Sequence, residues 1–104
     1  MTTALLTTAA LTAASLRRDG DALVFTGALL RSAIATLWPS ASKAAVGAQR
    51  FDLRAVERID SAGLAFLSQL AALAGGDVAI DGTPAGLTEL SAAYRLSPAL
   101  AFAY

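Results

Sequence analysis

The sequence contains neither cysteine nor histidine. The absence of cysteine excludes disulfide bonds and thiolate chemistry. The absence of histidine removes the usual general base and the commonest metal ligand, so a Ser-His-Asp triad cannot form within this chain. The carboxylates are few and dispersed, and no pair of them has an obvious metal-ligand spacing. These absences favour a protein that is not an enzyme and that uses no cofactor or metal.

The sequence also lacks an excess of charge of either sign, because eight Lys and Arg residues balance eight Asp and Glu residues. No basic run is interleaved with aromatic residues, although proteins that bind single-stranded nucleic acid have such runs. We therefore expect no nucleic-acid partner. The arginines are scattered along the chain, at Arg17, Arg18, Arg31, Arg50, Arg54, Arg58 and Arg95.

Long hydrophobic runs are missing as well, although 56% of the residues are apolar, many of them alanine. The uncharged segment 1–15 is shorter than the roughly 20 residues that a membrane span needs. It also lacks the positively charged start of a signal peptide. We expect residues 1–14 to be a frayed N-terminal segment rather than an export signal, and we expect no direct insertion into a membrane.

The length of 104 residues suits a single domain over residues 1–104. The chain opens with two strand candidates, 15–18 and 22–27, separated by a polar turn at 19–21. Its Asp-Gly pair is a hairpin signal. A helix is predicted over 28–38 because Leu30, Ile34 and Leu37 share one helical face, and Pro39 is expected to end it.

The rest of the chain alternates between strands and helices. We predict a strand at 50–54 that runs into a loop, a helix from Ser61 to Gly75-Gly76, a strand at 77–82 and a helix over 83–96, in which Thr83 is the N-cap and Pro84 the first helical residue. The predicted order is β-β-α-β-α-β-α. This order indicates an α/β fold with a small mixed sheet, in which an antiparallel hairpin is followed by parallel strands with helices packed on them.

The helix that begins at Ser61 has an unusual outer face. One half of it is apolar and is predicted to be buried, with Leu64, Phe66, Leu67, Leu70, Ala71, Leu73 and Ala74. The other half carries small, uncharged residues where Lys and Glu are usual, namely Ser61, Ala65, Ser68, Gln69 and Ala72. One interpretation is an exposed alanine-rich helix, which needs no partner because alanine is the best helix former. A flat face that another protein's helix approaches is the interpretation we favour, because Ser61 lies on the same stripe.

Ser61 has two interpretations that the residues leave open. A serine at a helix start is usually an N-cap. The same position also suits a phosphate, because unpaired N–H groups and the helix dipole favour negative charge there. Gly63 lies in the first turn, where glycine is unfavourable. We expect it to leave the backbone uncovered, so that a kinase or a partner can approach.

The stretch "IDSAGL", placed between a strand and a helix in this element order, resembles the STAS domain family of sulfate transporters and anti-sigma factor antagonists. The family's Asp-Ser/Thr-x-Gly pattern is matched by Asp60, Ser61, Ala62 and Gly63. The resemblance covers roughly residues 15–100. In the antagonist branch it implies a serine kinase that phosphorylates Ser61. In the other branch it implies the small cytoplasmic subunit of a lipid-asymmetry (Mla) ABC transporter, which binds the ATPase subunit.

Three features favour the transporter branch. The antagonists carry a Gly-Glu-Leu-Asp-like stretch after their second strand, whereas residues 27–30 read "GALL" and lack both carboxylates. Leu37-Trp38 and the tail residues Tyr94, Leu96 and Pro98 are similar to the transporter subunit. We therefore expect a cytoplasmic protein held at the inner membrane by its complex. The expected partner-binding residues are Asp60, Ser61, Ala62, Gly63, Ala65, Ser68, Gln69 and Ala72.

Overall fold

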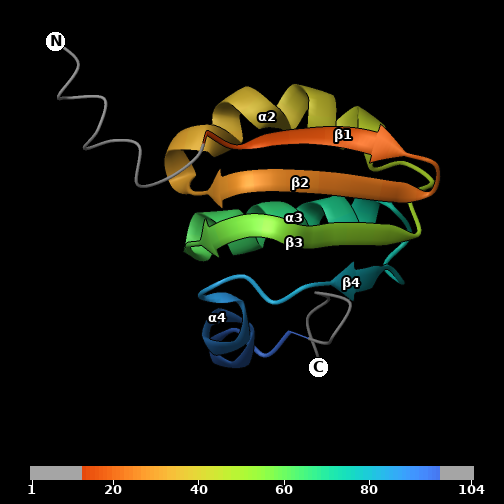
Figure 1. Cartoon of the computed structure of the whole chain (residues 1–104). Coiled ribbons are helices and arrows are strands. Elements are labelled where there is room, and N and C mark those ends of the chain that lie inside the picture. The colour runs from red at the N-terminus through yellow and green to blue at the C-terminus, as the bar shows by residue number, and fades with distance from the viewer. Residues whose placement is uncertain (1–12, 97–104) are drawn as a thin grey trace, which may run out of the picture.

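The computed structural model describes residues 13–96 and has the predicted order of strands and helices (Figure 1). The terminal segments 1–12 and 97–104, which include Pro98 and most of the expected frayed start, lie outside the described residues. The elements are β1 (Ser15–Asp19), β2 (Ala22–Leu29), α2 (Arg31–Ala44), β3 (Arg50–Ile59), α3 (Ser61–Leu73), β4 (Ala79–Asp81) and α4 (Leu87–Ala93).

The four strands form one mixed sheet in the order β1-β2-β3-β4. The β1–β2 pair is antiparallel, and its tight turn contains Gly20 at a positive φ of 62°. The β2–β3 and β3–β4 pairs are parallel. Helices α2 and α3 cover one face of the sheet, and α4 lies beyond the β4 edge (Figure 1). The predicted α/β fold is confirmed, and no helix of residues 13–96 covers the other face of the sheet.

The core lies between the sheet and helix α3. Aromatic rings from three elements meet there: the Phe25 and Phe51 centroids are 5.7 Å apart, and those of Phe25 and Phe66 are 6.2 Å apart. Leucines fill the space around the rings, with Leu23, Leu29, Leu53, Leu64, Leu67 and Leu70 all buried. Among residues 13–96 no polar or charged residue is buried. Hydrophobic burial therefore holds α3 against the sheet.

Strand β3 is longer than the predicted strand at 50–54, and it ends only at Ile59. Its buried residues are Phe51, Leu53, Val56 and Ile59, so the alternation breaks twice. The register with β2 also shifts twice, between Val24 and Thr26 and between Gly27 and Ala28. Each shift places one extra residue on β3, which is a β-bulge. The alternation of buried residues is thus lost because the strand is bulged, and not because the chain forms a loop as predicted.

Helix α2 does not end at Pro39, as predicted, but contains it and continues to Ala44. It also begins later than predicted, at Arg31, because residues 28 and 29 belong to β2. A proline inside a helix removes one hydrogen bond and costs about 3 kcal/mol. The following turn buries Ala41 and Ala45 completely. This burial of the chain after the proline opposes the cost and keeps the helix continuous.

Helix α4 is shorter than the predicted helix at 83–96, and its N-cap is Gly86 instead of Thr83. Ala85, which precedes Gly86, forms a parallel β-bridge with Arg58. The carbonyl oxygen of Ala85 accepts a hydrogen bond from the N–H of Ile59 at 3.0 Å. Residues before Gly86 therefore extend the sheet edge. Gly86 then turns the chain with a φ of 96°, which favours glycine.

Candidate docking site at the start of helix α3

Asp60 joins the starts of two helices. Its Oδ1 accepts a hydrogen bond from the N–H of Gly63 at 2.8 Å, and its Oδ2 accepts one from the N–H of Arg31 at 2.9 Å. The first bond is an N-cap of α3. The second satisfies the first N–H of α2, whose own N-cap position holds Leu30 and provides no side-chain acceptor. One half-buried carboxylate therefore caps both helices and fixes their relative position.

These contacts determine the ionisation of Asp60. Burial raises the pKa of its carboxyl, but the N–H groups of Arg31, Gly63 and Ala62 and the charge of Arg31 together lower it more. The net effect is a pKa below the ordinary value of 3.8. Asp60 is thus a carboxylate at neutral pH, and its negative charge is turned toward two helix starts.

Ser61 is not the helix cap. It is the first residue of α3 and it is exposed, whereas the capping acceptor is the side chain of Asp60. The helix-cap interpretation of Ser61 is therefore wrong. The physical reason is that Asp60 is the last residue in the extended conformation, with a φ of −109° and a ψ of −174°. Ser61 already belongs to the helix, so its side chain is not at the N-cap position. The hydroxyl of Ser61 remains at the surface.

Gly63 is buried, so it does not provide an approach for a kinase or a partner, contrary to the expectation. A Cβ atom at this position would collide with the carbonyl oxygen of Leu29. The glycine therefore permits close packing of the first turn of α3 on the end of β2. Of the four motif residues, Asp60 and Gly63 build the junction, while Ser61 is exposed and Ala62 is half-buried.

The predicted division of α3 into two faces is largely confirmed. The residues expected in the core are buried, except that Leu73 is 45% exposed and Ala74 is half-buried. On the outer side, Ala65, Gln69 and Ala72 are exposed and Ser68 is half-buried. We use the term docking face for the residues Ser61, Ala62, Ala65, Ser68, Gln69 and Ala72. This set contains no charged residue.

Two aromatic residues flank the docking face. Trp38 of α2 is 37% exposed, and its ring packs edge-on against Phe66 of α3 at a centroid distance of 6.2 Å. Tyr94, at the end of α4, is 50% exposed. Partly exposed aromatic residues are enriched at protein interfaces. Such a surface is suited to binding another protein.

Two hollows meet at Ser61. The first has a volume of about 330 Å³ and is lined by Arg31, Ser61, Ala62, Leu64, Ala65, Ser68, Tyr94 and Leu96. The second, of about 630 Å³, is shallower and includes Arg58, Ser61 and Glu89. Sequence reasoning did not identify Arg31 or Arg58 as part of the site. No periodicity links them to Ser61, because α2 and β3 bring them there through the fold.

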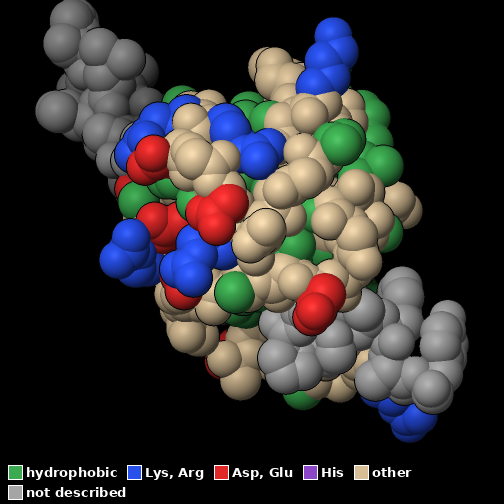
Figure 2. Space-filling view, turned by 90° about the vertical axis from the view of Figure 1, so that its right-hand side faces the viewer, with side chains coloured by type: hydrophobic (Ala, Val, Ile, Leu, Met, Phe, Trp, Pro, Cys, Tyr) green, Lys and Arg blue, Asp and Glu red, His purple; other side chains and the backbone are tan. Residues whose placement is uncertain are grey.

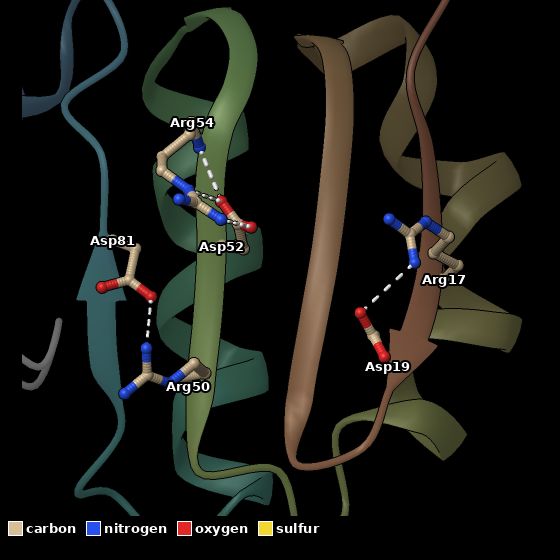
Figure 3. Close-up of polar contacts among 6 residues, drawn as sticks. All are labelled: Arg17, Asp19, Arg50, Asp52, Arg54 and Asp81. Atoms are coloured by element: carbon tan, nitrogen blue, oxygen red, sulfur yellow. Dashed lines mark hydrogen bonds and ion pairs between the residues drawn. The ribbon is translucent and has the colours of Figure 1, made fainter.

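The open sheet face has the opposite character. Figure 2 shows acidic and basic side chains gathered on one side of the molecule, and Figure 3 shows three ion pairs from β1, β3 and β4. Their N–O distances are 3.7 Å for Arg17–Asp19, 2.9 Å for Arg50–Asp81 and 2.8 Å for Arg54–Asp52. We use the term open sheet face for the surface that carries these six residues.

Asp52 is the most strongly affected of these side chains. Hydrogen bonds from the Arg54 side chain and backbone N–H lower its pKa to about 2, against a smaller opposing effect of burial. Exposed ion pairs of this kind contribute little to stability, typically less than about 1 kcal/mol each. Their main consequence is that the charges of the open sheet face are satisfied by one another.

Residues 13–96 contain no cluster of potential metal ligands and no helix that could cross a membrane. Within this range no three His, Cys, Asp or Glu residues are grouped so that they could hold a metal ion. The helices of the same range are all too short or too polar to cross a bilayer.

Neither the known protein-family models nor the curated protein sequences give a match to this chain. The resemblance to STAS domains accordingly depends on the Asp-Ser-Ala-Gly motif, on its position between β3 and α3 and on the order of the elements.

Proposed function

We propose that this chain is a non-catalytic subunit of the STAS type that binds the ATPase subunit of a phospholipid ABC transporter through the docking face. In this role it supports the assembly or the activity of the transporter. It resides in the cytoplasm and is held at the inner membrane by the complex. It needs no cofactor, and it turns over no substrate itself.

One observation carries the proposal: the exposed side of α3 is free of charge, whereas the open sheet face carries six charged residues that form three ion pairs. Charged residues are depleted at the centres of protein interfaces, because burying an unpaired charge is costly. Small side chains also lose little conformational entropy when a partner orders them. The flanking Trp38 and Tyr94 supply the aromatic contact that commonly contributes most of the binding energy.

The test is reconstitution with the ATPase subunit of the same organism's phospholipid transporter. The two chains are co-expressed with an affinity tag on the ATPase only, and co-elution is followed by a titration of binding. We expect a complex with a defined stoichiometry and a change in ATP hydrolysis by the transporter. A variant with Ala72→Glu serves as the negative control. If the parent chain does not co-elute with the tagged ATPase, the proposal is refuted.

A phosphoswitch is the second candidate function, and the surroundings of Ser61 favour it. The hydroxyl is exposed at the first position of α3, and the hollows on its two sides contain Arg31 and Arg58. A phosphate there would lie at a helix start and share its hollows with Arg31 and Arg58, which favour negative charge, and the second hollow also contains the carboxylates of Asp60 and Glu89. In this function a serine kinase is the partner, and phosphorylation controls binding as in anti-sigma factor antagonists.

The two candidates are separated by incubation with ATP and a GHKL-type serine kinase from the same organism. Intact-mass measurement then reports the addition of one phosphate, and Ser61→Ala is the control that must remain unmodified. Modification at Ser61 together with failure to bind the ATPase favours the phosphoswitch. Binding of the ATPase by an unmodified chain favours the transporter subunit.

A further inference from the structure

Within residues 13–96, Arg31, Arg58 and Arg95 form no ion pair, and of these three only Arg31 lines the pocket of about 330 Å³. Arg17, Arg50 and Arg54 form ion pairs, and Arg18 donates hydrogen bonds to the carbonyl oxygens of Gly20, Ala44 and Val46. Within residues 13–96, no carboxylate lies at ion-pair distance from the guanidinium of Arg31. The nearby carboxylate of Asp60 accepts the backbone N–H of Arg31 instead.

The position of Arg31 is also unfavourable for its own helix. It is the first residue of α2, and the first turn of α2 contains no acidic residue. A cation at a helix start is destabilising, because the positive end of the helix dipole lies there. Residues that oppose local preferences commonly serve a function. The Asp60 carboxylate, whose pKa the charge of Arg31 helps to lower, offsets part of this cost. The guanidinium forms no ion pair within residues 13–96, so it remains available to a partner.

Arg31 lines the pocket of about 330 Å³. Among the described residues that line it, Arg31 alone is charged, and Ser61 and Ser68 add hydroxyl groups. Leu64, Tyr94 and Leu96 form its apolar part. Four of the lining residues also belong to the docking face, so a protein bound on α3 would cover the pocket. An anionic group beside an apolar group is complementary to these walls.

We infer that this pocket receives an acidic side chain of the docked partner and an adjacent apolar one, with Arg31 as the counter-charge. The inference rests on the proposed docking function. An ion pair enclosed between two proteins is partly shielded from water, which strengthens the attraction between its charges. Truncating one member of such a pair also leaves the other without its partner. Arg31 would thus select for partners with a carboxylate at this point of the interface.

The experiment measures binding of the ATPase subunit by the parent chain and by two variants at low and moderate salt. Arg31→Gln removes the charge and leaves a shorter polar side chain, and we expect its affinity to fall at least tenfold, with a weaker dependence on salt. Arg17→Gln is the matched control on the open sheet face, and we expect its affinity to equal that of the parent. Thermal melts should show that both variants fold.

A double-mutant cycle then identifies the partner residue. Exposed Glu and Asp residues of the ATPase are changed one at a time to Gln and Asn. We expect one change to reproduce the tenfold loss with the parent chain and to have no further effect with Arg31→Gln.

Equal binding by Arg31→Gln and the parent would overturn the inference and leave the docking function in place. Absence of binding by the parent would overturn both. Two further results would overturn the inference by identifying a different occupant of the pocket. One is a small amphiphile retained by the purified chain and seen as added mass in native mass spectrometry. The other is a dimer of this chain, detected by sedimentation, that Arg31→Gln dissociates.

Discussion

The open sheet face and the docking face belong to one small domain and have opposite surfaces. The open sheet face carries three arginines and three aspartates that pair with one another. The docking face carries none, and the carboxylate at its start, Asp60, is engaged by backbone N–H groups. Charged residues, which attract attention in the sequence, can thus be paired within the domain. A surface of small uncharged residues remains available to a partner. Here the uncharged surface is the candidate for binding.

The largest expected effect concerns the packing beneath the docking face. Gly63→Ala should destabilise the fold by about 3 kcal/mol or more, because its Cβ would overlap the Leu29 carbonyl oxygen and force the backbone apart. Chemical denaturation measures the change. Ala65→Ser on the exposed side of the same helix is the control, with an expected change within about 0.5 kcal/mol. Equal stability of both variants would show that α3 does not pack on β2 in this way.

The next effect concerns the joint cap of the two helices. Asp60→Ala removes acceptors for two N–H groups and should cost about 1–2 kcal/mol, to judge from single caps. Because the pKa of folded Asp60 is lowered from 3.8, its carboxylate stabilises the fold at neutral pH. That contribution is lost as the pH falls below the ordinary value and through the lowered one. Asp60→Ala should therefore show a smaller loss of stability on acidification than the parent.

Asp52 on the open sheet face provides the comparison. Its pKa is lowered to about 2, so its contribution should disappear between its ordinary pKa of 3.8 and about 2. It is paired with an exposed arginine, and we expect Asp52→Asn to cost less at neutral pH than Asp60→Ala does. The reverse order, measured by denaturation at pH 7, would mean that ion pairs of the sheet matter more than the helix junction.

The contrast between the two faces is tested directly by adding the same charge to each. Ala65→Arg on the docking face and Ala55→Arg on β3 both replace an exposed alanine, so both should leave folding within about 0.5 kcal/mol of the parent. We expect Ala65→Arg to weaken binding of the ATPase at least tenfold, because it places bulk and charge in a flat contact. Ala55→Arg should bind normally. Equal losses would mean that the docking face has no special role.

The smallest effect on stability is expected at Ser61. Because Asp60 is the cap, Ser61→Ala should change the free energy of unfolding by no more than about 0.5 kcal/mol. Ser61→Asp should also fold, since a negative charge suits the first turn of a helix. It should nevertheless bind the ATPase several-fold more weakly than Ser61→Ala, because its carboxylate lies in the same pocket as Arg31 and would repel the acidic side chain of the partner. Titrations and thermal melts of both variants decide this point.

The sequence was sufficient for the element order and for the two faces of α3, because both follow from hydrophobic periodicity. It was insufficient where distant parts of the chain override a local signal. Pro39 is a helix stop by local rules, but burial of Ala41 and Ala45 continues α2. Thr83 and Pro84 form a good helix start, but the bridge from Ala85 to Arg58 holds them at the sheet edge.

The candidate site shows the same limit. Asp60 and Ser61 are both good N-caps, and only the geometry of the β3–α3 junction decides between them. Gly63 appeared to expose the backbone, whereas its neighbour is the Leu29 carbonyl, contributed by another strand. Arg31 joins the site because Asp60 accepts its N–H group. None of these contacts has a sequence spacing that a pattern could reveal.

The division of work within the Asp60–Gly63 motif has a consequence for how such chains are compared. Its first and last residues are constrained by the architecture, since one caps two helices and the other admits no side chain. A search built on those two positions would group chains by the way a strand meets a helix, whatever they bind. Information about the partner resides in the residues that the architecture leaves free to vary, from Ser61 outward along α3 to Ala72 and across to Arg31.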